Sequence, residues 1–316
     1  MDQRRTRLVA AHSSKYSLRS GVGLIFILLS LMFGLIVAQS LLSPVERLAR
    51  DVAKQQGAET PEEREELRRE VLDQIVDQAR PAVAWVLGSS SVDKIEDETE
   101  RVEAREDYEE WTSSLLDDKP ALLSAILLVL LWGWPFVVAV GAFDLVSSDV
   151  GSRRIRYQLL RVDRSSIFFG RLFGTVLTFI AVLVMLLGVV VLYMGLKLPY
   201  YEMSDLISWG AYGGLCLVVV SLPYIALCSW ISATVSSAMA SLTLSVLVIG
   251  GIPLFSVLGG QTSEHADKVL YLLPWGTQSH LFHHDTTLSV GAMLGCLGYT
   301  ALFTFLGHRK FVTRDL

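Results

Sequence analysis

The sequence predicts an all-α integral membrane protein with six transmembrane helices and an extracytoplasmic helical hairpin between the first two. Six apolar runs of about twenty residues are each long enough to cross a bilayer as a helix. Hydrophobic residues make up 52% of the 316-residue chain, above the usual share of a soluble domain. Acidic residues are concentrated at 43–119, which holds 22 acidic and 11 basic side chains and so carries −11, whereas the whole chain carries −5. The expected spans are 21–42, 120–143 and, within 172–306, the runs 172–194, 211–231, 239–258 and 288–306.

The first twenty residues are basic and contain a single acid. Their apolar residues are interspersed with the cations, which suits either an amphipathic helix on the cytoplasmic membrane surface or an unstructured positive anchor. The first span, 21–42, is free of charge and is followed by Ser43-Pro44, where we expect it to end. This run is too long for a signal-peptide core, so it is expected to remain as a span.

Residues 43–119 are predicted to form an acidic helical hairpin. Thr60-Pro61-Glu62-Glu63 combines a capping threonine, a first-turn proline and a capping-box glutamate, which is typical of a helix start. A second helical stretch is expected near 92–116. The first helix has a narrow apolar stripe at Leu67, Val71, Ile75 and Ala79. The hairpin is expected to pack on itself, on a second copy or on another protein, and its high charge is also compatible with partial mobility.

The segment 144–171 carries six arginines against three aspartates and lies between two long apolar runs. Short basic segments of this kind face the cytoplasm. The pattern places three apolar residues on one side of a helix: Ile155, Leu159 and Leu160. It predicts a short amphipathic helix at the cytoplasmic membrane surface that a partner can bind. The alternative is a topological anchor that only fixes orientation.

The charge distribution also predicts the orientation of the chain. With the N-terminus inside, every clearly basic segment is cytoplasmic, including the tail 307–316. The acidic segment 43–119 and the loop 259–286 are then outside. Both termini are therefore expected in the cytoplasm.

Small and polar residues recur in the later spans. Ser232, Ser236 and Ala240 are spaced four apart, a pattern that lets helices approach closely in lipid. Prolines inside three spans can kink a helix. All three cysteines lie within apolar runs, so neither a disulfide framework nor a CxxC metal site is expected.

The loop 259–286 contains three closely spaced histidines, His280, His283 and His284. They could share a helix face and bind a metal ion, with His265 or Asp285 as a further ligand. The alternative, which we expect, is that they are interfacial or solvent-exposed side chains without a metal.

The sequence has no GxxxxGK[ST] phosphate loop, no HExxH motif and no GxSxG nucleophile elbow. Its spans lack ionisable residues except at their edges, and coupled carriers usually need such groups at mid-membrane depth. We therefore expect no catalytic residue, no cofactor in this chain and no nucleic-acid partner. If the protein moves a substrate, the energy is expected to come from another polypeptide.

A set of positions after the second span forms a pattern: Asp149, Gly151, Leu159, Leu160, Arg164 and Gly170. This pattern resembles the signature of ABC exporter permeases of the ABC-2 class. The sequence departs from it at Asp149, where glutamate is more usual, at Val162-Asp163, where Pro-Val is common, and at Arg171, which replaces lysine. The ending Arg314-Asp315-Leu316 is also similar to that family, and six spans cover the chain in the expected order. The insertion at 43–119 resembles the subgroup related to the permease of nitrous-oxide-reductase copper-site maturation.

The resemblance implies a permease subunit in the bacterial cytoplasmic (inner) membrane, paired with a second copy or a homologue. A separate P-loop ABC ATPase would bind ATP and Mg²⁺ and dock on the coupling segment. The implied coupling residues are Asp149, Gly151, Arg153, Arg154, Arg156, Leu159, Leu160 and Arg164. Substrates of this class include lipids, glycolipids, peptides and drugs. The alternative is a membrane sensor or assembly factor whose segment 43–119 binds an extracytoplasmic partner.

Overall fold

The computed structural model describes residues 6–11, 21–55, 61–87, 98–198, 201–259 and 266–314, which are helical almost throughout and contain no strand. Residues 6–11 form a short helix. The remaining helices are α2 (Gly21–Gln55), α3 (Pro61–Leu87), α5 (Glu98–Leu116), α6 (Ala121–Ala142), α7 (Ser147–Gly151), α8 (Ile155–Leu159), α9 (Arg164–Lys197), α10 (Met203–Thr234), α11 (Ala238–Gly259), η1 (Ala266–Leu272), α12 (Trp275–Gln278), η2 (Ser279–Phe282) and α13 (Thr286–Thr313). The all-α prediction is therefore confirmed for these residues.

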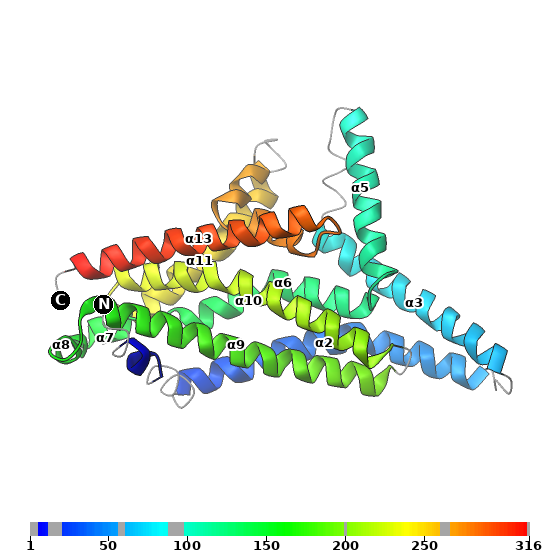
Figure 1. The fold of residues 1–316 in the computed structure, drawn as a ribbon, viewed down its shortest axis with the longest axis horizontal. Coiled ribbons are helices and arrows are strands. Elements are labelled where there is room, and N and C mark those ends of the chain that lie inside the picture. The colour runs from blue at the N-terminus through cyan, green and yellow to red at the C-terminus, as the bar shows by residue number, and fades with distance from the viewer. Residues whose placement is uncertain are drawn as a thin grey trace.

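Six helical stretches are long and apolar enough to cross a membrane, which confirms the predicted number of spans in the described residues. They belong to α2, α6, α9, α10, α11 and α13. Figure 1 shows the helix over residues 6–11 and the end of α13 at the same end of the bundle, as expected for an even number of crossings. We call this the basic end, and we call the opposite end, where α3 and α5 lie, the acidic end.

The centre of the bundle is the pair α6 and α10. In each of them 72% of the apolar stretch is buried, compared with 17% in α11 and 22% in α13. Two indole hydrogen bonds join the pair: Trp134 Nε1 donates to Ser221 Oγ at 2.7 Å, and Trp209 Nε1 donates to Ser124 Oγ at 2.9 Å. The outer helices instead keep apolar surface that lipid or another chain has to cover.

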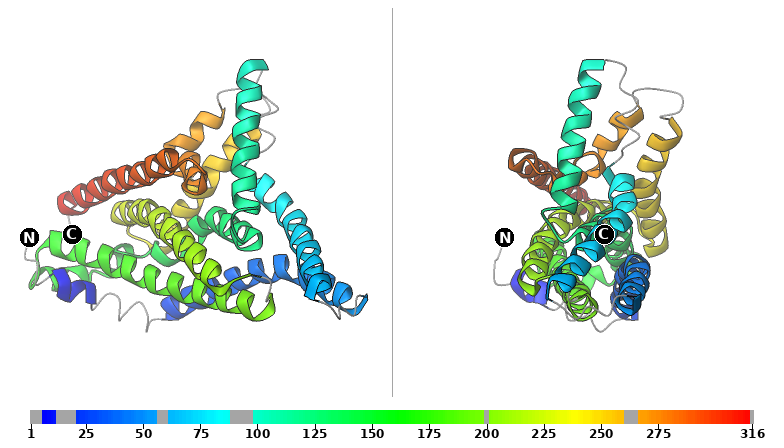
Figure 2. Two further views of the ribbon diagram at one scale, coloured as in Figure 1. Left: turned by 45° about the vertical axis from the view of Figure 1, so that its right-hand side comes forward. Right: turned by 90° about the vertical axis from the view of Figure 1, so that its right-hand side faces the viewer.

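The acidic segment forms two helices that behave differently. Val71, Ile75 and Ala79 of the predicted stripe are buried, and the stripe extends through Val83 and Val86 as α3 packs on α2 and α6. Leu67 and Thr60 lie outside the residues whose side chains are described. Helix α5 instead projects from the bundle and diverges from α3 (Figures 1 and 2). Only its last turns are buried, so the described residues do not form a paired hairpin.

The first span ends near Ser43-Pro44, as predicted, but the helix that contains it does not end there. The apolar stretch ends at Val45, but α2 continues through Pro44 to Gln55. A proline inside a helix removes one backbone hydrogen bond, and the residues that follow here, 46–50, are good helix formers. Pro135, Pro223 and Pro253 likewise lie inside continuous helices.

Candidate functional site

The predicted coupling segment folds as two short helices rather than one. Helices α7 and α8 are separated by residues 152–154, and residues from Arg164 onward already belong to α9. The prediction of a single amphipathic helix is therefore wrong. Arg153 has a φ of 59°, in the left-handed region, and this conformation ends α7 in the way that a helix C-terminus usually ends with glycine.

Hydroxyl groups of α10 and α11 hold the start of the coupling segment. Ser232 Oγ accepts hydrogen bonds from the backbone N–H groups of Val146 and Ser147, both at 3.0 Å. Ser241 Oγ donates to the Phe143 carbonyl at 2.6 Å. These contacts use buried side chains, so α7 has a fixed position against two membrane-crossing helices.

Gly151 lies against the turn that joins α10 and α11. A Cβ atom at this position would lie 2.3 Å from the Ser236 carbonyl oxygen, so a side chain does not fit unless the backbone moves. Residues 235–237 are a turn, so the small residues of 232–241 are divided between the end of α10 and the start of α11. They form the surface on which α7 packs.

Asp149 is engaged inside the chain by Arg171 of α9. The two side chains form a hydrogen-bonded ion pair and are 19% and 13% exposed. Arg171 also donates to the Leu145 carbonyl at 2.7 Å and to Gln158 Oε1 at 2.9 Å. One guanidinium group thus connects α9 to the backbone before α7 and to both short helices.

Two further arginines bind the carbonyl ends of helices. Arg164 donates to the carbonyl oxygens of Val312 and Arg314, at 2.8 and 2.6 Å, where α13 ends. Arg314 in turn donates to the carbonyl oxygens of Ala233 and Val235, at 2.8 and 3.0 Å, where α10 ends. Cations at helix C-termini satisfy orphan carbonyls and oppose the helix dipole. Asp315 and Leu316 lie outside the described residues.

Most side chains of residues 152–161 are exposed. Tyr157 is 76% exposed and Leu160 is 83% exposed, whereas Ile155 is buried. The prediction that Leu160 shares a face with Ile155 is wrong, because residues five apart point about 140° away from each other around a helix. We define the basic knob as the exposed residues Arg153, Arg154, Arg156, Tyr157, Leu160 and Arg161. Leu159 is only half-buried beneath it.

The N-terminal helix over residues 6–11 packs beside this segment. Thr6 Oγ1 donates to Ser166 Oγ at 3.2 Å, and a Cβ at Gly170 would lie 2.6 Å from Val9 Cγ1. The helix predicted for the N-terminal tail is present over these residues, and residues 12–20 lie outside the described part of the chain.

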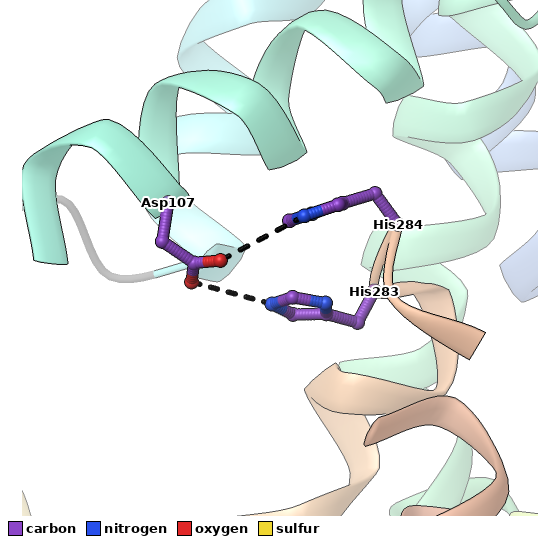
Figure 3. A group of neighbouring side chains, drawn as sticks. All are labelled: Asp107, His283 and His284. Atoms are coloured by element: carbon purple, nitrogen blue, oxygen red, sulfur yellow. Dashed lines mark hydrogen bonds and ion pairs between the residues drawn. The ribbon is translucent and has the colours of Figure 1, made fainter. Parts of the chain in front are cut away.

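A second cluster lies at the acidic end, between α5 and the loop before α13. Figure 3 shows Asp107 of α5 facing His283 and His284. His283 Nε2 is 3.3 Å from one carboxylate oxygen of Asp107, and His284 Nε2 is 3.8 Å from the other. Glu110 Oε2 lies 3.7 Å from His284 Nε2. The structure therefore brings together two of the three predicted histidines with two acids that the sequence analysis did not select.

The other predicted metal ligands have different surroundings. His280 stacks on Trp111 at 5.8 Å between ring centroids, and burial lowers its pKa. The Asp285 carboxylate accepts the Thr287 N–H at 2.7 Å and so caps α13. His265 lies outside the described residues. No spacing pattern pointed to Asp107, because it is 176 residues from His283 in the sequence.

The basic knob can bind an acidic protein surface, and the cluster around Asp107 has donor atoms suited to a metal ion. These two sites lie at opposite ends of the six candidate spans (Figure 1). No protein-family model and no curated protein matches this chain.

Proposed function

We propose that this chain is the membrane-spanning permease subunit of an ATP-driven exporter of the ABC-2 type. A separate P-loop ABC ATPase, which carries ATP and Mg²⁺, docks on the basic knob. One observation carries the proposal: the basic knob is exposed, and the chain segment that holds it is hydrogen-bonded to α9, α10 and α11. This chain itself is not assigned an enzymatic role.

The chemistry of the knob suits a protein partner. Four exposed arginines surround Tyr157 and Leu160, the two most exposed large hydrophobic residues of the segment. Tyrosine and arginine are enriched where protein interfaces gain most of their energy. An acidic groove with an apolar floor would complement this surface in charge and in shape.

The base of the knob explains how a docked partner would move the spans. Ser232 at the end of α10, Ser241 at the start of α11 and Arg171 in α9 all bind the segment directly. A displacement of the knob therefore acts on three helices at once. Packed helices with discrete contacts transmit such a displacement better than a loose loop does.

The orientation and assembly belong to the same proposal. The basic end faces the cytoplasm of a bacterial inner membrane, where the positive charge is retained and ATP is available. The acidic end is then extracytoplasmic. A second copy or a homologous permease covers part of the apolar surface that α2, α11 and α13 leave exposed.

The test is affinity purification of the chain with its associated ATPase from mild detergent, followed by an ATPase assay. Arg156→Glu and Leu160→Asp are expected to abolish co-purification and stimulated ATPase activity, while thermal stability stays unchanged because both side chains are exposed. Arg309→Glu is the matched control, since this exposed arginine lies on α13 at the same end but outside the knob. It is expected to behave like the natural chain.

Full ATPase stimulation and transport by Arg156→Glu and Leu160→Asp would show that the knob is not the coupling surface. A clean preparation without any ATPase, under conditions that preserve known complexes, would contradict the permease proposal as a whole.

The second candidate is a membrane sensor or assembly factor that binds a partner through α5. The observation that favours it is the exposure of this projecting acidic helix (Figure 2). Under this alternative, the double variant Glu103→Lys and Glu106→Lys loses function, while an ATPase is dispensable. Under the permease proposal the same variant keeps its ATPase.

A further inference from the structure

The junction between α5 and the loop before α13 is built from two sets of side chains. Asp107, Glu110 and Trp111 share one face of α5, because they are three and four residues apart. His283 and His284 follow directly after η2 and face Asp107 (Figure 3). Glu110 lies beside His284, and Trp111 beside His283. One ring nitrogen of each histidine and one carboxylate oxygen of Asp107 all lie within 4.8 Å of one another.

We propose that this junction binds one divalent transition-metal ion of the zinc class. Asp107, His283 and His284 are the ligands, and Glu110 supplies a fourth. The proposal does not depend on the permease assignment, because it uses only the side chains at this junction.

The donor set favours this class of metal. Two imidazoles with carboxylates are typical zinc ligands, whereas calcium and magnesium prefer oxygen atoms alone. Zinc bonds of roughly 2.1 Å in a tetrahedron place the ligand atoms about 3.4 Å apart. The shortest contacts are near this spacing: 3.3 and 3.8 Å from the two histidines to separate oxygens of Asp107, and 3.7 Å from His284 to Glu110. One donor atom from each of Asp107, His283 and His284 lies within 4.8 Å of the other two, so the set must contract when an ion binds.

The His283 ring is also held in place from behind. Trp111 Nε1 donates to the Phe282 carbonyl at 2.7 Å, and its ring lies 4.6 Å from that of His283. The backbone N–H of Asp285 donates to His283 Nδ1 at 3.0 Å, which leaves Nε2 facing Asp107. A neutral His283 ring then carries its proton on Nε2. A metal ion at Nε2 requires the other tautomer, with the proton on Nδ1, so the Asp285 N–H must release Nδ1 when the ion binds.

The ligands come from two parts of the chain, which Trp111 also joins. Helix α5 projects from the bundle, while His283 and His284 immediately precede α13 (Figure 1). His283 is buried and His284 is partly exposed, so an ion can enter from the side of His284. A bound ion would fix α5 to the start of a membrane-crossing helix, which makes this a structural or regulatory site.

The experiment uses the full chain in mild detergent, without a polyhistidine tag, after treatment with a chelator. Zn²⁺ is titrated by calorimetry, and hydrogen exchange of α5 is followed with and without Zn²⁺. We expect one ion per chain and slower exchange of α5 in its presence. Asp107→Asn and His284→Ala are expected to weaken binding by at least about tenfold, since even residues that only support a ligand have effects of this size.

Glu106→Gln is the matched control, because it removes an exposed charge next to Asp107 on the same helix. It should bind Zn²⁺ as the natural chain does. Absence of stoichiometric binding overturns the proposal and leaves an ion-paired contact only. If Asp107→Asn and His284→Ala bind Zn²⁺ as tightly as the natural chain does, the ion lies elsewhere. If Glu106→Gln weakens binding as much as these two variants do, the ion is only attracted to the acidic surface.

Discussion

The two ends of the bundle hold their protruding segments in opposite ways. At the basic end, α7 and α8 are bound by Ser232, Ser241 and Arg171 from three separate helices. At the acidic end, α5 is joined to the loop before α13 through Trp111 and Asp107, and most of its surface is exposed. The comparison indicates a rigid projection at one end and an adjustable one at the other. A rigid projection suits the transmission of force, and an adjustable one suits control by a ligand.

The largest effect that we expect from this comparison comes from Arg171→Met. The variant leaves Asp149 without its partner in a site where both side chains are less than one-fifth exposed. Breaking a buried ion pair by removing one partner costs about 3 kcal/mol or more. Thermal unfolding in detergent should therefore show a clear loss of stability, and hydrogen exchange should show that α7 and α8 have become mobile.

The double variant Asp149→Asn with Arg171→Met is the control for this prediction. It removes the uncompensated charge, so it should recover part of the lost stability. A single variant as stable as the natural chain would contradict the rigid attachment of the basic end.

A smaller effect is expected from Trp111→Phe at the acidic end. The variant keeps most of the ring contact but leaves the Phe282 carbonyl without its indole donor, at a cost of roughly 1–3 kcal/mol for a buried group. We expect most of this loss to appear locally, as faster hydrogen exchange in α5, with little change in α6 and α10. Trp85→Phe on α3 is the matched control, because Trp85 is 68% exposed. Equal loosening of α6 and α10 would show that α5 is an integral part of the core.

The parts of the fold that could be predicted from the sequence depend on the length and spacing of its apolar runs. The six spans and the stripe on α3 follow from hydrophobic periodicity, which is a local property. The break in the helix after the second span could not be predicted from the sequence, because Arg153 adopts a left-handed conformation that is unusual for arginine. One such residue ends α7 and separates it from α8.

The candidate sites were predictable only where their residues are neighbours in the sequence. His283 and His284 were selected together, but Asp107 is 176 residues from His283 and is one of 32 acids in the chain. Arg164 and Asp149 were selected as coupling residues, yet their side chains bind within the chain. Their charge was visible in the sequence. Their partners, the end of α13 and Arg171, depend on how the helices assemble.

The smallest predicted difference concerns the two aspartates that begin long helices at opposite ends. Asp163 caps α9, accepting from both the N–H and the hydroxyl of Ser166 at 3.0 and 2.8 Å, whereas Asp285 caps α13 through the Thr287 N–H. We expect Asp163→Ala to lower the unfolding free energy by about 0.5–1 kcal/mol, as for other exposed caps, and to cost more than Asp285→Ala. Thermal unfolding of the two variants near neutral pH measures this order, which would be contradicted by a larger loss for Asp285→Ala.

The same pair gives a pH dependence with a defined sign. The Ser166 hydroxyl lowers the pKa of Asp163 below 3.8, so its carboxylate stabilises the folded state. This contribution is fully present above the pKa of the unfolded chain and is lost as the pH falls through the lower folded pKa. The stability difference between the natural chain and Asp163→Ala should therefore be constant from pH 7 down to about 5 and shrink below about pH 4. A difference that stays constant to pH 3 would show that the carboxylate charge does not contribute to the cap.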